Sequence, residues 1–530
     1  MLGTLPAAFP VNGLAQMLVN GMIQKAQAAA VGTPLRNYVY FSTHGAPPRW
    51  VFDLFLTPYN ESGFVPNAQV GTVGVAQGGR YTSVRYHTVK RQGLNVPPLW
   101  AIRVPAAGGG TRTIDPLLKD LLHIRGIDTS APAHPAAQTR TFRPIGAAYT
   151  VTGLIADTAQ GLPLKGINLG SVNYEFEGKS GSTPAVFPLQ RKEKLGEMLL
   201  NPFASGAPEQ FQQTKQSLSA EIDQAQGTLD AYAQSQHPGA ESIRKSQADV
   251  EAIMSSAVAR LLPKWEQIYK KYDSLCERSI REIRVPGVTD KPIGAAQRPA
   301  NMAMYKYKDG GFATSPADLR DVFVPGKSHI RNMAEAFALA EFALTEKLSN
   351  SIVAHVGSFS DLKINNANFQ YNVDEHQVGA LMSLAVNTIW YGAYAACLAE
   401  LIDELKAKRL FDDTVVHVGS EFGRSPNAAG DGSNHGYQGN SVAIYSGMVK
   451  GPIVIGNIMN NFNSASYPGT WGAAAPSVQG RKITPAHVAN TLAAMLRLPE
   501  IVKLGPEHAL INVNDSANLV TAKIGKADQK

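Results

Sequence analysis

Thr414-Val-Val-His-Val-Gly419, followed by Ser420-Glu-Phe-Gly-Arg-Ser-Pro426, is the stretch that decides the fold. Its β-branched run predicts a buried strand, and the polar residues after it predict a loop at the carboxyl end of that strand. A second polar segment, Asp431-Gly-Ser-Asn-His-Gly436, follows a few residues later. Open α/β sheets bind their ligands in such loops. An acid, an arginine and a histidine gathered there predict a metal and oxyanion site, or what remains of one.

Helical and extended patterns alternate through the second half of the chain. Apolar, β-branched runs predict strands at 37–43, 351–356, 414–419, 442–445 and 453–456. Apolar periodicity predicts helices at 332–350 and 375–409, and a last helix to about residue 498 that has Thr484 as its N-cap and Pro485 in its first position. This alternation indicates an α/β fold with a mostly parallel sheet and helices on both faces. For residues 57–200 we predict mixed strands and loops.

A long helical hairpin is predicted for residues 206–284. Its first helix carries apolar residues at intervals of three and four from Leu218 to Tyr232. His237-Pro-Gly239 breaks this pattern, and a second apolar series runs from Val250 to Leu275. An exposed hairpin of this length is suited to docking. We therefore expect a protein partner or a second copy of the chain to bind there.

The N-terminal segment resembles an export signal. Residues 1–33 are apolar and rich in small residues, and the alanines at 28–30 resemble a cleavage site. Pro6, Pro10 and Gly13 interrupt the apolar run, so we do not expect a transmembrane helix, which needs about 20 apolar residues. The alternative is an amphipathic docking helix. The export interpretation predicts a protein of the bacterial periplasm or cell envelope.

Four parts are predicted along the chain. The export-like or docking segment at 1–33 precedes the first part of the α/β domain at 34–205. The helical hairpin at 206–284 is inserted into that domain, and 285–530 forms its second part.

Composition excludes several classes of protein. Of the 530 residues, 17% are charged, below the ~25% of a typical soluble domain, so the chain is compact and not disordered. The net charge is +7 and no dense Lys/Arg cluster alternates with aromatics, so nucleic-acid binding is not expected. Two cysteines, Cys276 and Cys397, are too few for a zinc finger or an iron–sulfur cluster. Both fall on apolar helical patterns typical of buried free thiols, and a disulfide would require those helices to lie side by side.

Four short segments follow one another in a recognisable order: 44–48, 373–377, 401–426 and 433–436. The first, His-Gly-Ala-Pro-Pro, resembles a Gly-Gly-Pro-Ser turn, and the second resembles a Trp-Asp-Thr-His segment. The third resembles a long helix, a strand and a Ser-Glu-Phe-Gly-Arg-Thr-Pro signature, and the fourth resembles Arg-Asp-His-Trp. In this order they resemble a bacterial family of the alkaline phosphatase and sulfatase superfamily that is usually exported by the twin-arginine route.

The resemblance implies a metal site for ester hydrolysis. Members of that superfamily bind divalent metals through Asp and His at strand ends and attack phosphate or sulfate esters with a Ser, Thr or modified Cys near the first strand. Zinc, calcium or magnesium suits such ligands, and the alternative is a chain that binds no metal. Arg424 is the candidate for holding an anionic ester through its guanidinium fork. The metal-ligand candidates are Asp374, His376, Glu421 and His435, with Asn434 and His44 as weaker ones.

Two positions depart from the family pattern. Pro48 stands where the turn offers its Ser, and Asn434 stands where the family has an Asp before its final His. Proline has no hydroxyl, and the neutral amide is a weaker ligand than a carboxylate.

Structural alternatives exist for most of the candidates. Glu421 and Arg424 also fit an ion pair that ties down the loop, and His376 fits a solvated residue at the start of a helix. For His44 we expect a hydrogen-bonded loop residue. For His134 and His355, two histidines outside the matched segments, we also expect structural roles.

Two functions are consistent with these residues. The missing Ser favours a pseudoenzyme, a cell-envelope protein that uses the superfamily fold as a scaffold or binding component. The retained Asp374, Glu421, Arg424 and His435 favour a divergent metal-dependent phosphoester or sulfoester hydrolase. The first is the expectation from sequence, and enzymatic activity is left open.

Overall fold

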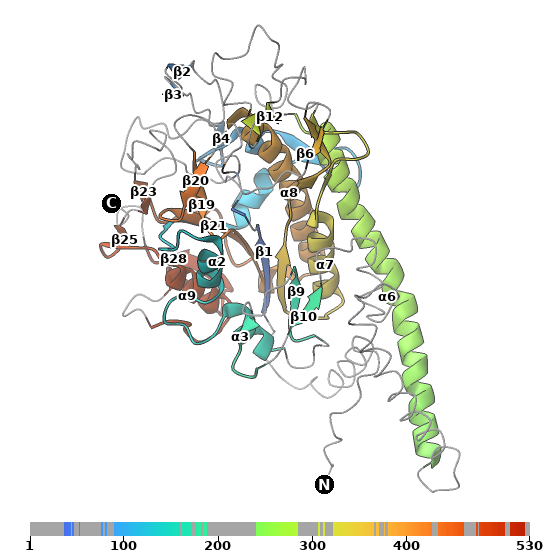
Figure 1. Ribbon diagram of the computed structural model, residues 1–530. Coiled ribbons are helices and arrows are strands. Elements are labelled where there is room, and N and C mark those ends of the chain that lie inside the picture. Colours follow the sequence, from blue (N-terminus) through green and yellow to red (C-terminus); the bar gives the residue numbers. More distant parts are fainter. Residues whose placement is uncertain are drawn as a thin grey trace.

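A mostly parallel sheet lies at the centre of the protein (Figure 1). Among the described residues it has eight strands, in the order β10-β9-β14-β1-β18-β21-β8-β22. This computed structural model describes residues 36–43, 45–46, 52, 76–77, 80–81, 89–159, 162, 164–170, 176–181, 184–187, 240–284, 306–307, 311–312, 322–364, 367–369, 376, 380–426, 433–459, 473–474, 476–503 and 509–524.

One strand of this sheet runs against the others. β21 is antiparallel to both of its neighbours, β18 and β8, whereas every other pairing is parallel. The other seven strands therefore end at the same edge. In sheet order the strands are β10 Ala185–Phe187, β9 Ile167–Leu169, β14 Ser351–His355, β1 Asn37–Ser42, β18 Thr414–Gly419, β21 Asn440–Tyr445, β8 Leu121–Ile127 and β22 Ile453–Ile455.

The central strands are buried on both faces, because successive side chains of a strand point to opposite sides. In β1, Val39 and Phe41 join one apolar cluster, and Tyr38 and Tyr40 join a second cluster on the other side. β14 and β18 divide their residues between the two clusters in the same way. The sheet thus separates two hydrophobic cores, as expected when both faces carry helices.

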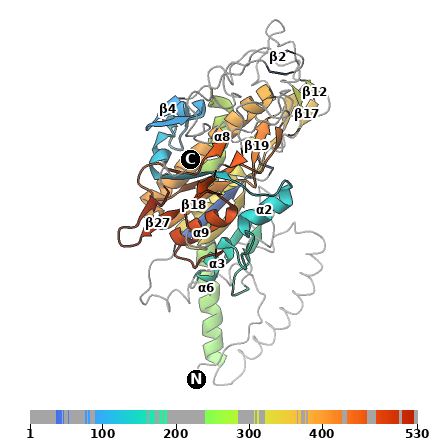
Figure 2. The ribbon, with the colours of Figure 1, turned by 90° about the vertical axis from the view of Figure 1, so that its left-hand side faces the viewer.

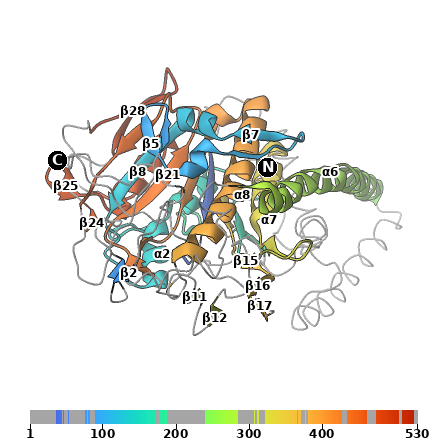
Figure 3. The same cartoon turned by 90° about the horizontal axis from the view of Figure 1, so that it is seen from above.

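Helices cover both faces. One core contains residues of α6 (Ala240–Glu282), α7 (Met333–Thr345) and α8 (Ala380–Ala407). The other contains residues of α2 (His134–Phe142), α3 (Val151–Asp157) and α9 (Pro485–Met495). Figure 1 shows the first group to the right of β1 and the second to its left, and Figure 3 shows α6 outermost on its side. The predicted α/β fold with helices on both faces is confirmed.

The other described elements are short. Contrary to the prediction of strands and loops for 57–200, α2 and α3 are helices. The 3-10 helices are η2 Pro98–Ala101, η3 Asp115–Asp120 and η9 Phe411–Asp413. The paired small strands are β2 Ala76–Gln77 with β3 Arg80–Tyr81, β4 Val89–Arg91 with β5 Leu94–Val96, β6 Arg103–Pro105 with β7 Thr111–Thr113, β11 Lys306–Tyr307 with β12 Gly311–Phe312, β13 His329–Ile330 with β15 Phe359–Ser360, β16 Leu362–Ile364 with β17 Ala367–Phe369, β19 Gly423–Pro426 with β20 Ser433–Gly436, β23 Ile458–Met459 with β24 Ala473–Ala474, β25 Pro476–Val478 with β26 Arg481–Lys482, and β27 Ile511–Asn514 with β28 Leu519–Ala522.

α6 is the second helix of the predicted hairpin. It has 43 residues, which corresponds to a length of about 65 Å. Its C-terminal part packs on α7 and α8, and its N-terminal half extends below the other helices and strands in Figures 1 and 2. The first predicted helix of the hairpin, at 206–239, lies outside the described residues.

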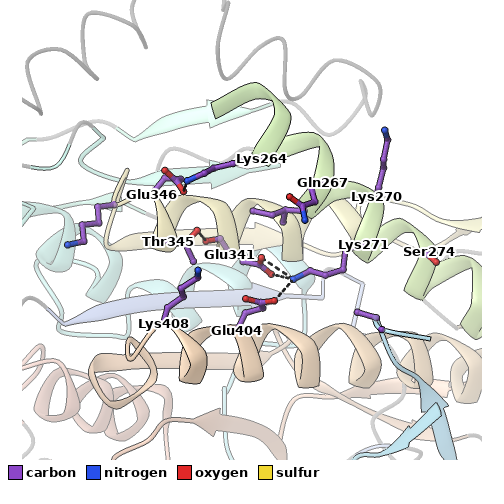
Figure 4. A pocket seen from close by; sticks show the side chains of 14 residues that line it. Lys264, Gln267, Lys270, Lys271, Ser274, Glu341, Thr345, Glu346, Glu404 and Lys408 are labelled. Carbon is purple, nitrogen blue, oxygen red and sulfur yellow. Dashed lines mark hydrogen bonds and ion pairs between the residues drawn. The ribbon is translucent and has the colours of Figure 1, made fainter. Parts of the chain in front are cut away.

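An ionic cluster joins α6 to the two helices beneath it. Lys271 Nζ lies 2.8 Å from Glu341 Oε2 on α7, and 3.2 Å and 3.1 Å from the carboxylates of Glu400 and Glu404 on α8. The Tyr272 hydroxyl donates to Glu341 Oε2 at 2.6 Å. Figure 4 shows Lys271, Glu341 and Glu404 on the wall of a cavity of about 1020 Å³. One ammonium group is thus shared by three acids from two helices.

Candidate metal centre

The carboxyl ends of β1, β18 and β8 converge at one edge of the sheet. The loop after β1 is bonded to the end of β18, since Thr43 N–H donates to the Gly419 carbonyl at 3.1 Å. After β18 the chain makes the β19–β20 hairpin, in which Arg424 lies directly opposite His435. β8 leads through Pro132 into α2. Segments far apart in the sequence therefore meet where open α/β sheets place their sites.

Glu421 is a buried carboxylate that joins two of these segments. Its Oε1 accepts a hydrogen bond from Gly45 N–H at 2.8 Å and another from His134 Nδ1 at 2.7 Å. Because a carboxylate oxygen accepts, Nδ1 of His134 carries the hydrogen, and Nε2 of the neutral ring holds the lone pair. A carboxylate behind a histidine is the arrangement that orients imidazole ligands of metals.

Arg424 is also buried, and it binds the same loop. Its Nε donates to the Ala46 carbonyl at 2.9 Å and its Nη2 donates to the Gly45 carbonyl at 2.6 Å. Nη1 lies 3.4 Å from His376 Nε2. The guanidinium therefore holds the loop after β1 through its carbonyls, while Glu421 holds it through an N–H group. One edge of the guanidinium remains beside the histidines.

Three histidines form a cluster next to Glu421 and Arg424. His134, His376 and His435 each offer a ring nitrogen, and the three nitrogens lie within 4.8 Å of one another. Nε2 of His376 and Nε2 of His435 are 2.8 Å apart. The ring of Phe422 lies 4.6 Å from that of His134 and 4.4 Å from that of His435, measured between centroids, so it packs against both.

His435 is oriented from behind in the same way as His134. Its Nδ1 donates to the Pro132 carbonyl, which leaves the lone pair on Nε2, the atom that faces His376. Burial lowers the pKa of His435, and the nearby Arg424, His134 and His376 act in the same direction, against the bond to Pro132, which raises it. A neutral ring is the form that binds a metal.

The cluster fits a transition-metal ion. A tetrahedral zinc ion, with bonds of about 2.0–2.1 Å, keeps its ligand nitrogens roughly 3.3–3.4 Å apart, a separation that lies within the spread of these atoms. Imidazole nitrogen suits zinc better than calcium or magnesium, which prefer oxygen ligands. His376 is exposed, and His134 and His435 are half-buried. An ion held there would be open to solvent on one side.

The structure places Glu421, Arg424, His376 and His435, four of the residues predicted from sequence, close together. His376 lies in a bend, four residues before the first described residue of α8. Glu421 stands behind a histidine and does not belong to the cluster of ring nitrogens.

The remaining candidates lie apart from the cluster or outside the described residues. Asn434 is exposed and precedes His435 on β20, so its side chain points to the opposite face of that strand. Asp374 and His44, together with Pro48, lie outside the described residues.

His134 is the residue that sequence reasoning missed. It is the first residue of α2 and lies 287 positions before Glu421, so no local pattern links the two. The available signal was its position: a His-Pro pair opens a helix shortly after the buried strand β8. The structure places it in the cluster, whereas the sequence suggests a structural role for it.

Residues 374–465 match the model of a protein family described as a protein of unknown function, DUF1501. The matched segment includes β18, the β19–β20 hairpin, His376 and His435, but not His134. It is a minor part of the chain. A comparison with curated proteins finds no match.

Proposed function

We propose that His134, His376 and His435 bind a zinc-type divalent ion, and that the chain is a metal-dependent hydrolase of anionic esters with an alkaline phosphatase/sulfatase-like fold. The convergence of three imidazole nitrogens at the carboxyl edge of the sheet carries this proposal. Three histidines with an open fourth position are typical of catalytic zinc sites. When bound there, such an ion supplies a Lewis acid for ester hydrolysis.

The surrounding residues have supporting roles in this proposal. Glu421 and the Pro132 carbonyl hold two of the imidazoles in the tautomer that presents Nε2. Arg424 places a permanent positive charge beside His376, which favours an anionic substrate such as a phosphoester or sulfoester. Pro48 replaces the Ser expected as nucleophile, so water is the nucleophile that the proposal requires.

Metal content and activity test the proposal together. The purified full-length chain is loaded with zinc and passed through a desalting column. It should then retain about one equivalent of zinc per chain, as measured by inductively coupled plasma mass spectrometry. It should also hydrolyse an aryl phosphate or an aryl sulfate. His435→Ala and His134→Ala should each lose both properties, because two imidazoles are too few for tight zinc binding.

His329→Ala provides the matched control, because it removes an accessible imidazole from β13, outside the cluster. This variant should keep the metal and the activity. Wild-type protein that retains no metal, or a His435→Ala variant that binds zinc as tightly as wild type, contradicts the metal site.

A second function is favoured by a different observation. Glu421 and Arg424 both bind the backbone of residues 45–46, as expected where charged residues are kept for structure, and α6 extends from the body (Figure 2). We therefore propose, as the alternative, a scaffold or binding component that meets a protein partner or a second copy through α6. Stoichiometric metal without turnover of either ester supports this alternative.

We further propose that the protein acts in the bacterial periplasm or cell envelope. The resemblance to an exported family and the export-like residues 1–33, which lie outside the described residues, support this location. Among the described residues, no helix combines the length and the apolar character needed to span a membrane. Fractionation of the source cells with an antibody against the protein tests the proposal, and recovery with cytoplasmic markers contradicts it.

A further inference from the structure

Cys276 on α6 and Cys397 on α8 are the two cysteines of the chain, and their sulfur atoms lie 3.8 Å apart. Both are buried and carry free thiols. They are separated by 121 positions in the sequence, so only the packing of α6 on α8 brings them together. Their contact involves none of the residues of the histidine cluster.

Contacts on either side of the two thiols along the helices fix how α6 packs on α8. Toward one end, Lys271 of α6 reaches Glu400 and Glu404 of α8. Toward the other end, Gly392 of α8 meets Ile283, which follows α6: a Cβ atom on Gly392 would lie 2.3 Å from the Ile283 side chain. The helices run antiparallel, because residues later in α6 meet residues earlier in α8. The thiols lie between these two contacts, where the helices are in close and defined contact.

We propose that Cys276 and Cys397 form a disulfide that fixes α6 to α8. A disulfide bond is about 2.05 Å long, so each sulfur moves by roughly 0.9 Å from its position in the thiol form. The two thiols lose two protons and two electrons. The electrons and protons pass to an oxidant such as glutathione disulfide. Exchange through a mixed disulfide reduces this oxidant to two glutathione thiols.

Folding is the stage at which this bond forms. The side-chain hydrogen bond with Cys397 and then burial raise the pKa of the Cys276 thiol, so the folded protein holds little of the thiolate that exchange requires. Before α6 packs on α8, both thiols are accessible to an oxidant. Once the helices have packed, the closed bond is shielded from reductants in the same way.

Alkylation followed by intact-mass measurement tests the proposal on the full-length chain. The protein is unfolded, refolded with glutathione disulfide and a little reduced glutathione, then denatured and treated with iodoacetamide. The expected result is no alkylation of the refolded monomer, and two alkylations after reduction. A protease digest should yield one peptide pair joined through Cys276 and Cys397, and the oxidised protein should melt roughly 3–6 °C higher than the reduced protein.

Cys276→Ser and Cys397→Ser are the matched controls. Each should retain one thiol that is alkylated or capped by glutathione, and its melting temperature should not change with reductant. Two alkylated thiols in the refolded wild-type monomer overturn the proposal, as do linkages found only between chains. A disulfide that forms but lowers the melting temperature also overturns it, since the bond would then not fit the folded packing. The mass measurement on the wild-type chain decides whether the disulfide forms, even if the cysteine variants fold poorly.

Discussion

At the scale of single residues, the hydrogen bonds made by Nδ1 of the candidate metal ligands matter as much as the Nε2 atoms that would bind the metal. Nδ1 of His134 donates to Glu421, and Nδ1 of His435 donates to a backbone carbonyl. Only the first of these acceptors is a side chain that substitution can change. Glu421 therefore offers a direct test of whether orientation from behind controls metal affinity.

Glu421→Gln should weaken zinc binding by about 10–100-fold without unfolding the protein. The glutamine oxygen can still accept from Gly45 N–H, but the amide no longer gives His134 a charged acceptor. Competition with a zinc-binding dye measures the affinity, and circular dichroism checks the fold. An unchanged affinity would show that Glu421 serves only to tie the loop after β1.

Asn434→Ala should leave zinc affinity within about a factor of two of wild type. Asn434 is next to His435 in sequence, but the alternation of β20 turns it to the other face. The same dye titration measures the zinc affinity, with His435→Ala as the variant that is expected to lose zinc binding. A large loss of affinity would instead assign the amide to the metal.

At the scale of elements, Lys271 makes the central charged contact between α6 and the two helices on which it packs. Burial by itself lowers the pKa of Lys271, but hydrogen bonds and charges from Glu341, with Glu400 and Glu404, outweigh it and raise that pKa. Burial raises the pKa of Glu341 despite its bonds to Lys271 and Tyr272. The ammonium group is therefore held firmly, whereas the buried acid depends on it.

Lys271→Met should lower the free energy of unfolding by about 2–4 kcal/mol, because it leaves partly buried carboxylates without their cation. Lys264→Met is the matched control on the same helix: Lys264 pairs with Glu346, both residues line the same cavity (Figure 4), and the Lys264 side chain is 46% exposed. An exposed pair of this kind contributes less than about 1 kcal/mol. Urea denaturation measures both, and equal losses would contradict the special role of Lys271.

α9 gives a prediction for pH. Its N-cap, Thr484, donates its backbone N–H to Nδ1 of His487 at 3.2 Å. Burial, and then the charge of Arg481, lowers the pKa of His487 below the ordinary value of 6.5 for a histidine. Below about pH 6.5 the unfolded chain therefore binds a proton that the folded chain resists, and stability falls as pH falls, until the lower pKa of the folded state is reached.

His487→Gln should reduce this loss of stability between pH 7 and pH 5. Glutamine also accepts from the N-cap N–H group but does not titrate. The slope should decrease by at most about 1.4 kcal/mol per pH unit, the value for one proton. Thermal melts across this range measure it, with pH 8 as the internal reference, where both proteins carry a neutral side chain. Parallel pH profiles would refute the assignment.

The elements that the sequence predicts correctly have strong local patterns. The strands β1, β14, β18, β21 and β22 are runs of β-branched or aromatic residues, and the N-cap of α9 is marked by a Thr-Pro pair. α3 was missed because Val151-Thr-Gly-Leu-Ile155 has the composition of a strand. The Thr150 side chain, which accepts from Gly153 N–H at 2.9 Å, and packing on the sheet favour the helix instead.

The residues of the candidate site also divide into those that a local motif identifies and those that only the fold brings together. The Glu421–Arg424 signature and His435 are close in sequence, so a motif finds them. His134 is brought to them only by the sheet, which places the end of β8 at the same edge as the end of β18. The partners of Glu421 and Arg424 could not be predicted either, because they are backbone groups of residues 45–46, more than 370 positions away.

At the scale of the whole molecule, a bound ion would connect three separate parts of the chain. The ligand candidates come from the start of α2, from the bend before α8 and from β20. An ion that binds only when these parts are assembled stabilises the folded state by mass action.

Zinc should therefore raise the stability of the wild-type protein by about 2.7 kcal/mol at a free concentration 100 times its dissociation constant. Addition of a chelator such as EDTA should reverse the gain. His435→Ala should show neither effect, and His329→Ala should behave as wild type. Thermal melts with and without zinc measure this, and a similar gain in His435→Ala would indicate that zinc binds elsewhere.

The central position of β1 has a consequence for synthesis of the protein. Its two neighbours, β14 and β18, come much later in the sequence: Asn350, just before β14, bonds to the backbone of Arg36, 314 positions earlier. At roughly 5–20 residues per second, the ribosome needs roughly 15–60 s to make that interval. Throughout this time the apolar strand Asn37–Ser42 has no neighbour on either side. We therefore expect the nascent chain to need chaperones during this interval, and the translation speed of the intervening codons to set how long it needs them.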